Sequence, residues 1–182
     1  MSRFFIALLP PQYIQDYANE IKQHFADHYA SRGAQNSPPH ITLQPPFEWS
    51  DAHVPQLEAS LKEFASRQQP IPIMLNGYAA FPPRVIYINV IKSQALLTLQ
   101  ADLMGYVESN LEIVDQVSQT RPFAPHITVA FRDLTKQNFR LAWPEFVQRS
   151  LNFDFTADKL TLLLHDGQRW NIKSKFAFCS NL

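Results

Sequence analysis

The sequence of 182 residues predicts an α+β fold in a single domain over residues 1–182. Three observations support this prediction. Apolar residues make up 46% of the chain, which is enough for a substantial core, and no linker-like segment divides it. Segments with helical spacing of apolar residues alternate with short strand-like segments. The order of these segments in the first half is roughly repeated in the second.

The first half is predicted to begin with a buried strand over Arg3–Leu9, which is apolar almost throughout. Pro10-Pro11 then opens a helix that fades near Gly33, because proline is favoured at the start of a helix. A polar loop leads to a short β-branched strand at His40–Leu43, with prolines on both sides. The remaining elements of this half are a helix over 51–67 and strands over 71–75 and 85–90.

In the second half, Ser93 is the predicted N-cap of a long helix, and a connecting loop runs from that helix to Pro122. A short strand is expected at Pro125–Phe131. The segment Lys136–Gln148 has a helical composition, although Pro144 disturbs it. The last elements are an alternating segment over 151–155 and two strands, 160–164 and 169–176, which flank Asp166-Gly167. This dipeptide is typical of an antiparallel hairpin.

Composition excludes several classes of function. The chain has only 4 glycines, none spaced for a dinucleotide-binding or P-loop turn. Cys179 is the only cysteine, so an intramolecular disulfide and a cysteine-rich metal site are excluded. Lys plus Arg and Asp plus Glu are both 16, and the zero net charge does not fit a protein that coats long nucleic acids. The apolar run near Phe4 is too short for a signal peptide or a membrane span, so we expect a cytoplasmic protein without membrane association.

The tetrapeptide Pro-His-Ile-Thr occurs twice, at residues 39–42 and 125–128, in corresponding places of the two halves. In a strand, residues i and i+2 project from the same face. His40 and Thr42 should therefore point together, and so should His126 and Thr128. If a pseudo-twofold axis relates the two strands, two imidazoles and two hydroxyls face one cleft.

Two facing imidazoles suit acid–base chemistry at phosphorus. A neutral histidine can accept the proton of an attacking water, and a protonated one can donate to the departing oxygen. Threonine hydroxyls can hydrogen-bond the non-bridging oxygens of the phosphate. This scheme needs no metal and no cofactor. It predicts a bell-shaped pH–rate profile with pKa values near the unperturbed value of about 6.5.

On these two motifs the chain resembles the 2H phosphoesterases, close to bacterial 2′-5′ RNA ligase-like proteins. Their signature is two HxTx motifs about 80 to 90 residues apart, and the Phe-x-Pro-His lead-in is present at Phe123–His126. The resemblance implies a bilobal, pseudo-twofold arrangement of two antiparallel-rich sheets, flanked by helices around a central cleft. It also implies metal-independent opening of 2′,3′-cyclic phosphates, or reversible 2′-5′ joining of RNA ends, with the two histidines and two threonines as the catalytic set.

Two aromatic residues near the motifs and three arginines are candidates for substrate binding. Phe47 and Phe123 lie close in sequence to the two motifs and are candidates for stacking on a nucleobase. Many relatives carry an arginine five residues after the second histidine; here that position is Phe131, and Arg132 follows it. Arg132 is therefore a candidate phosphate ligand. Two further candidate anion binders are Arg84 and Arg121.

Three functions remain open on the sequence alone. The first is a cyclic phosphodiesterase that acts on an RNA end or a cyclic nucleotide. The second is hydrolysis of a small cyclic phosphate, such as one derived from ADP-ribose. The third is a nucleotide- or RNA-binding module with little turnover. The intact His and Thr pairs favour an enzyme, and no protein partner is evident.

Overall fold

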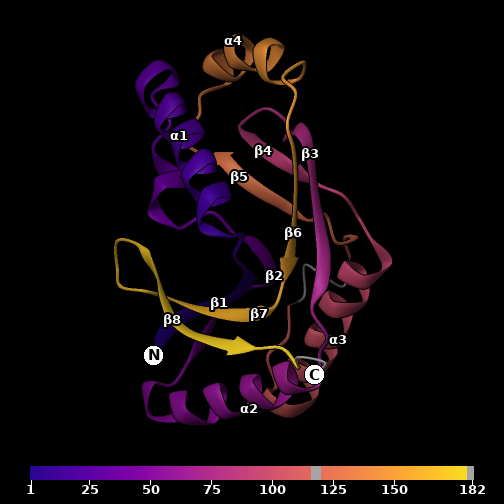
Figure 1. The fold of residues 1–182 in the computed structure, drawn as a ribbon. Coiled ribbons are helices and arrows are strands. Elements are labelled where there is room, and N and C mark those ends of the chain that lie inside the picture. Colours follow the sequence, from indigo (N-terminus) through magenta and orange to yellow (C-terminus); the bar gives the residue numbers. More distant parts are fainter. Residues whose placement is uncertain (116–119, 180–182) are drawn as a thin grey trace.

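A computed structural model describes residues 1–115 and 120–179 of the chain. Figure 1 shows two sheets with helices around them. The strands are β1 (Ser2–Leu8), β2 (Ile41–Trp49), β3 (Ile71–Phe81), β4 (Val85–Val90), β5 (His126–Ala130), β6 (Asn152–Ala157), β7 (Lys159–His165) and β8 (Trp170–Ala177). The α-helices are α1 (Gln12–Tyr29), α2 (Val54–Ser66), α3 (Gln94–Leu111) and α4 (Lys136–Phe146), and short 3₁₀ helices lie at η1 (Gly33–Asn36) and η2 (Asp51–His53).

Both sheets are antiparallel and four-stranded, with the orders β2-β1-β7-β8 and β5-β4-β3-β6. The two motif strands, β2 and β5, occupy equivalent edges, and this places the repeated tetrapeptide in equivalent positions of the two sheets. Helix α1 packs near β5, α2 packs against β8, and α3 lies against β2 and β3 (Figure 1). The predicted α+β class and its pseudo-twofold arrangement of two sheets are confirmed.

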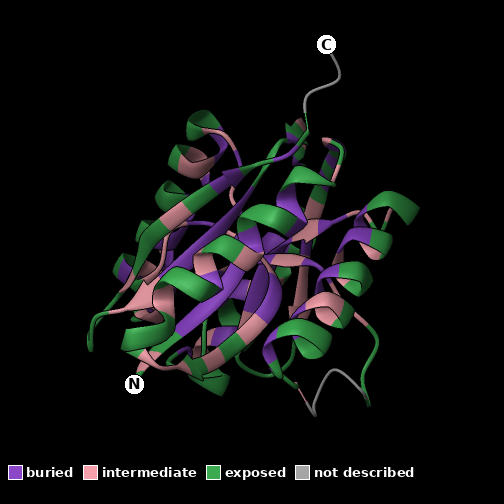
Figure 2. Cartoon of the chain, turned by 90° about the horizontal axis from the view of Figure 1, so that it is seen from below, coloured by how far each residue is buried: buried purple, intermediate pink, exposed green. Residues whose placement is uncertain are grey.

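The main core is one continuous cluster that draws on both sheets and on all four helices. Figure 2 shows buried residues along the strands and exposed residues on the outer sides of the helices. Strand β1 is buried on both faces, since Phe4, Ile6 and Leu8 enter the main core while Phe5 and Ala7 join a second, smaller cluster. Burial on both faces explains why this segment is apolar without alternation. Among the described residues, no helix combines the length and the apolar character needed to cross a bilayer.

Two predicted strands are longer in the structure. The strand expected at His40–Leu43 begins at Ile41 and runs to Trp49, through Pro45 and Pro46. Prolines are tolerated because β2 is an edge strand, and its pairing with β1 is irregular there. Strand β3 likewise extends to Phe81, past Gly77, whose φ of 65° accompanies a shift of register against β4.

Local signals in the second half are confirmed more closely. The Ser93 hydroxyl accepts a hydrogen bond from the Leu96 amide at 3.2 Å, as an N-cap should. Helix α4 accommodates Pro144 near its end. In the β7–β8 hairpin, Asp166 Oδ1 accepts from the amides of Gln168 and Arg169 at 2.8 and 2.7 Å. The hairpin and the capped helix were therefore predictable from local sequence.

Candidate active site

The two motif strands meet where the sheets approach each other, and some Cα atoms of β2 and β5 lie within 8 Å. His40, Thr42, His126 and Thr128 all line one cavity of about 370 Å³. Their side chains share this cavity because each strand is an edge strand and each motif has the i, i+2 spacing. Residues 86 positions apart (126 − 40) in the chain therefore form one site.

Both imidazoles are held in the same way. His40 Nδ1 lies 2.7 Å from the Pro38 carbonyl oxygen, and His126 Nδ1 lies 2.6 Å from the Ala124 carbonyl oxygen. Because a carbonyl oxygen only accepts, each Nδ1 carries a proton and donates it. The Nε2 atom of each neutral ring is then a proton acceptor, and in the imidazolium it is a donor. The repeated motif thus provides two rings in one tautomer.

Apolar neighbours surround both rings. The Phe5 ring lies 4.7 Å from that of His40, and the rings of Phe81 and Tyr87 both lie 5.1 Å from that of His126, between centroids. Desolvation lowers the pKa of His40 to about 4, with smaller contributions from the charges of Lys22 and His126. Desolvation also lowers the pKa of His126. The expectation of two pKa values near the unperturbed one is therefore wrong for the free protein, because both rings are partly buried among apolar neighbours.

The wall of this cavity beyond β5 contains Phe131 and Arg132. Strand β5 ends at Ala130, so Arg132 lies in the turn after the strand, where the alternation of faces no longer applies. Its guanidinium lies over the Phe131 ring, 5.1 Å from the centroid. Arg132, which was predicted to bind the phosphate, thus lines the cavity, and it is exposed next to an aromatic ring.

Four further residues of the cavity lining could not be predicted from the sequence. They are Phe5 of β1 and the hairpin residues His165, Gln168 and Trp170. The Trp170 ring makes edge contacts with Phe5 and His165, with centroids 4.6 and 4.8 Å apart, and the Arg3 guanidinium lies over it at 5.5 Å. The hairpin signal pairs His165 with Trp170, but only the β2-β1-β7-β8 order brings this pair to the cavity.

A single carboxylate joins two other parts of the cavity wall. Asp133 accepts hydrogen bonds from the Ser31 hydroxyl at 2.8 Å and from the amides of Arg32 and Gly33 at 2.6 and 2.8 Å. The Ser31 hydroxyl in turn accepts from the Phe131 amide at 3.4 Å. Residues of η1 and the turn after β5 both line the cavity, so Asp133 fixes these two parts relative to each other.

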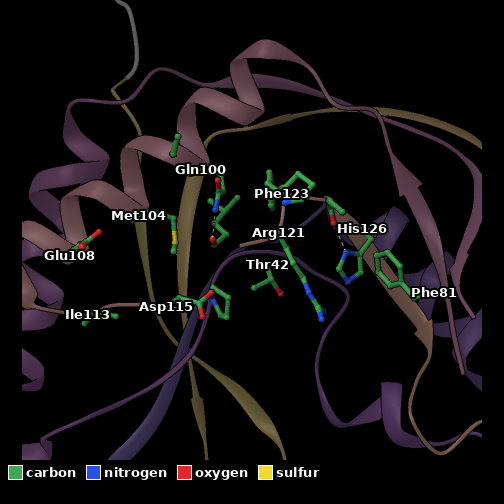
Figure 3. A pocket seen from close by; sticks show the side chains of 15 residues that line it. Thr42, Phe81, Gln100, Met104, Glu108, Ile113, Asp115, Arg121, Phe123 and His126 are labelled. Carbon is green, nitrogen blue, oxygen red and sulfur yellow. Dashed lines mark hydrogen bonds between the residues drawn. The ribbon is translucent and has the colours of Figure 1, made fainter. Parts of the chain in front are cut away.

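A second cavity of about 530 Å³ adjoins the first and shares Thr42 and His126 with it (Figure 3). Two predicted binding residues, Arg121 and Phe123, line this second cavity. In Figure 3, Met104 and Ile113 lie on the side away from His126 and Phe81. The remaining lining is largely apolar, and its polar groups are Gln100 and Glu108 of α3 and Asp115. The predicted site residues thus fall on both sides of His126.

Two predicted binding residues are not brought to either cavity. The Phe47 ring stacks on that of Phe4, with centroids 6.2 Å apart, and packs against the main core. Arg84 is exposed in the turn between β3 and β4. Phe47 was predicted from its closeness in sequence to a motif and Arg84 only from its residue type, and the alternation of β2 directs Phe47 to the core.

Comparison with known proteins assigns the chain to a family. The model of the 2′-5′ RNA ligase superfamily matches residues 10–169. A predicted phosphoesterase of Geobacillus kaustophilus is 30% identical over 179 residues, which cover 96% of this chain and 95% of the relative. A similarly described protein of Oceanobacillus iheyensis is 29% identical over 178 residues, which cover 96% of each chain.

Solved structures share the fold. TT0787 of Thermus thermophilus superimposes with a TM-score of 0.68 at 20% identity, covering 97% of both chains. E. coli LigT, solved as a complex with 3′-AMP, gives a TM-score of 0.67 at 22% identity, covering 98% of this chain and 99% of that one. The repeated motif, the fold and these matches agree, and the chain is a 2H phosphoesterase of the 2′-5′ RNA ligase superfamily.

Proposed function

We propose that this phosphoesterase hydrolyses 2′,3′-cyclic phosphates on RNA ends or nucleotides without a metal ion. The observation that carries the proposal is the cavity where both imidazoles donate Nδ1–H to backbone carbonyls. This leaves two Nε2 atoms for proton transfer, as the acid–base scheme requires.

In the proposed reaction, a water oxygen attacks phosphorus while the bond from phosphorus to one ribose oxygen breaks. One imidazole accepts the water proton at Nε2, and the other donates a proton from Nε2 to the departing ribose oxygen. The hydroxyls of Thr42 and Thr128 donate hydrogen bonds to the non-bridging oxygens, where negative charge is concentrated. Arg132 adds a positive charge at the rim of the same cavity.

A nucleoside fits the character of the cavity beyond the phosphate position. Its lining includes the partly exposed Trp170, and aromatic side chains are common partners for nucleobases. Base–aromatic stacking contributes about 1–3 kcal/mol per base. This aromatic residue therefore favours a nucleoside or RNA end over a small cyclic phosphate without a base.

A second candidate function is reversible 2′-5′ joining of RNA ends. The observation that favours it is the second cavity, which shares Thr42 and His126 with the first. A hydroxyl of a second nucleoside, bound among Met104, Ile113 and Phe123, takes the place of water in this reaction. Hydrolysis uses only the first cavity, whereas joining uses both.

The test compares turnover of two substrates: a nucleoside 2′,3′-cyclic monophosphate, which reports hydrolysis, and a 2′-5′-linked dinucleoside monophosphate, whose cleavage is the reverse of joining. His40→Ala and His126→Ala should each lower turnover of the cyclic substrate by about 10²–10⁴-fold, the usual range for one general acid or base. Met104→Trp, which fills the second cavity, should leave this hydrolysis intact and suppress cleavage of the dinucleoside. Wild-type activity in either histidine variant would contradict the mechanism. Binding of the cyclic nucleotide without turnover would favour a binding module instead.

A further inference from the structure

Lys22 is a buried cation beside the candidate active site that the proposed mechanism does not use. It lies in α1 with only 2% of its surface exposed, and its Nζ donates a hydrogen bond to the Ser37 carbonyl oxygen at 2.8 Å. Among the described residues, none of the ion pairs includes Lys22. A buried ammonium without a carboxylate partner is costly to fold, which points to a role in the function of the site.

The Lys22 bond falls on the segment that orients His40. Ser37 begins the sequence Ser37-Pro38-Pro39, and the next carbonyl, that of Pro38, accepts the Nδ1–H of His40. The two prolines have no amide hydrogen, and the β2 ladder starts only at Ile41. Lys22 therefore anchors the peptide unit next to the one that holds the imidazole.

The charge of Lys22 acts on the same ring. Its ammonium disfavours protonation of His40 and so contributes to the lowered pKa, as does His126 on β5. The other titratable or charged groups at this cavity are Arg132, after β5, and His165, at the end of β7. At the second motif, desolvation is the main cause of the lowered pKa of His126, without a contribution from a lysine. The two identical tetrapeptides thus have different electrostatic surroundings.

We infer that Lys22 is a positioning residue for His40: it fixes the lead-in peptide and, in addition to desolvation, its positive charge disfavours the imidazolium form, so that His40 is the general base and His126 the general acid. The assignment of base and acid rests on the proposed function. The interaction between Lys22 and His40 does not rest on the proposed function, and it can be measured without a substrate.

The first experiment is an NMR titration of the imidazole nitrogens in the wild type, Lys22→Met and Lys22→Arg. Methionine matches the length of lysine but has no charge and no donor. In Lys22→Met the pKa of His40 should rise by about one unit, the scale of a like charge nearby, while that of His126 stays the same. Lys22→Arg keeps the charge and should keep the wild-type value. An unchanged His40 titration in Lys22→Met would overturn the inference.

The second experiment is the pH profile of kcat/KM with a nucleoside 2′,3′-cyclic monophosphate. In Lys22→Met the acid limb should move up by about one pH unit, which lowers the rate on that limb about tenfold, and the alkaline limb should stay. Lys62→Met, which changes an exposed lysine of α2, should move neither limb. Movement of the alkaline limb alone would make His40 the acid and overturn the assignment. If the wild type does not turn over this substrate, the proposed function fails, while the NMR titration still decides the Lys22–His40 interaction.

Discussion

Replacement of Lys22 by methionine should stabilise the folded protein at neutral pH. Burial lowers the pKa of Lys22 from 10.5 to about 7, because the ammonium is removed from water. In the unfolded chain the lysine keeps its ordinary pKa. Above about pH 10.5 the lysine is neutral in both the folded and the unfolded state, so burying it carries no free-energy penalty for loss of the charge's hydration. The penalty grows as the pH falls towards 7 and is complete below it.

The size of this penalty follows from the two pKa values. Their difference, 10.5 − 7, corresponds to about 5 kcal/mol at 1.36 kcal/mol per pKa unit. At pH 7 about half of the folded molecules have Lys22 neutral, which reduces the penalty to about 4 kcal/mol. Methionine removes it, but leaves the Ser37 carbonyl without this donor, at a cost of about 1–3 kcal/mol. The expected net gain is about 2 kcal/mol at pH 6–7.

Urea unfolding of the wild type and Lys22→Met, measured between pH 6 and 10, tests this calculation. The gain at pH 6–7 corresponds to about 4–8 °C in Tm for a protein of this size. It should shrink as the pH rises and change sign near pH 9, where the remaining penalty no longer exceeds the cost of the lost hydrogen bond. Lys62→Met serves as the surface control and should follow the wild type throughout. A difference in stability that does not vary with pH would contradict this prediction, because it would show that the buried group is not titrating.

Three further predictions concern the candidate active site. The acid limb of the kcat/KM profile should lie below pH 6.5, since burial lowers the pKa of both His40 and His126; a limb above pH 7 would contradict this. Asp133→Ala should destabilise the protein by about 1–3 kcal/mol and raise KM more than it lowers kcat, because it releases η1 from the turn after β5. Unchanged KM and Tm would show that the carboxylate does not hold these two parts of the cavity wall together. Turnover should survive EDTA, because the proposed proton transfers need only the two imidazoles, and loss of activity that a divalent cation restores would oppose the mechanism.

Several features of this protein could be predicted because they depend on neighbours in the chain. The i, i+2 spacing placed each histidine with its threonine, and the repetition of the tetrapeptide indicated a paired site. The Ser93 cap and the Asp166-Gly167 turn were predictable for the same reason, since their hydrogen bonds join residues at most three positions apart.

The rest of the site depends on contacts between distant segments. Only the order of strands in the first sheet brings Trp170 and His165 to the cavity that contains His40, and only the packing of α1 places Lys22 beneath the segment before that histidine. Phe47 shows the converse, because its closeness to the motif in sequence did not bring it to the cavity. The chemical groups and their pairing on each strand thus follow from local sequence. The cavity lining around them and the unequal electrostatic surroundings of the two histidines do not, because burial and charge depend on which distant segments pack against each ring.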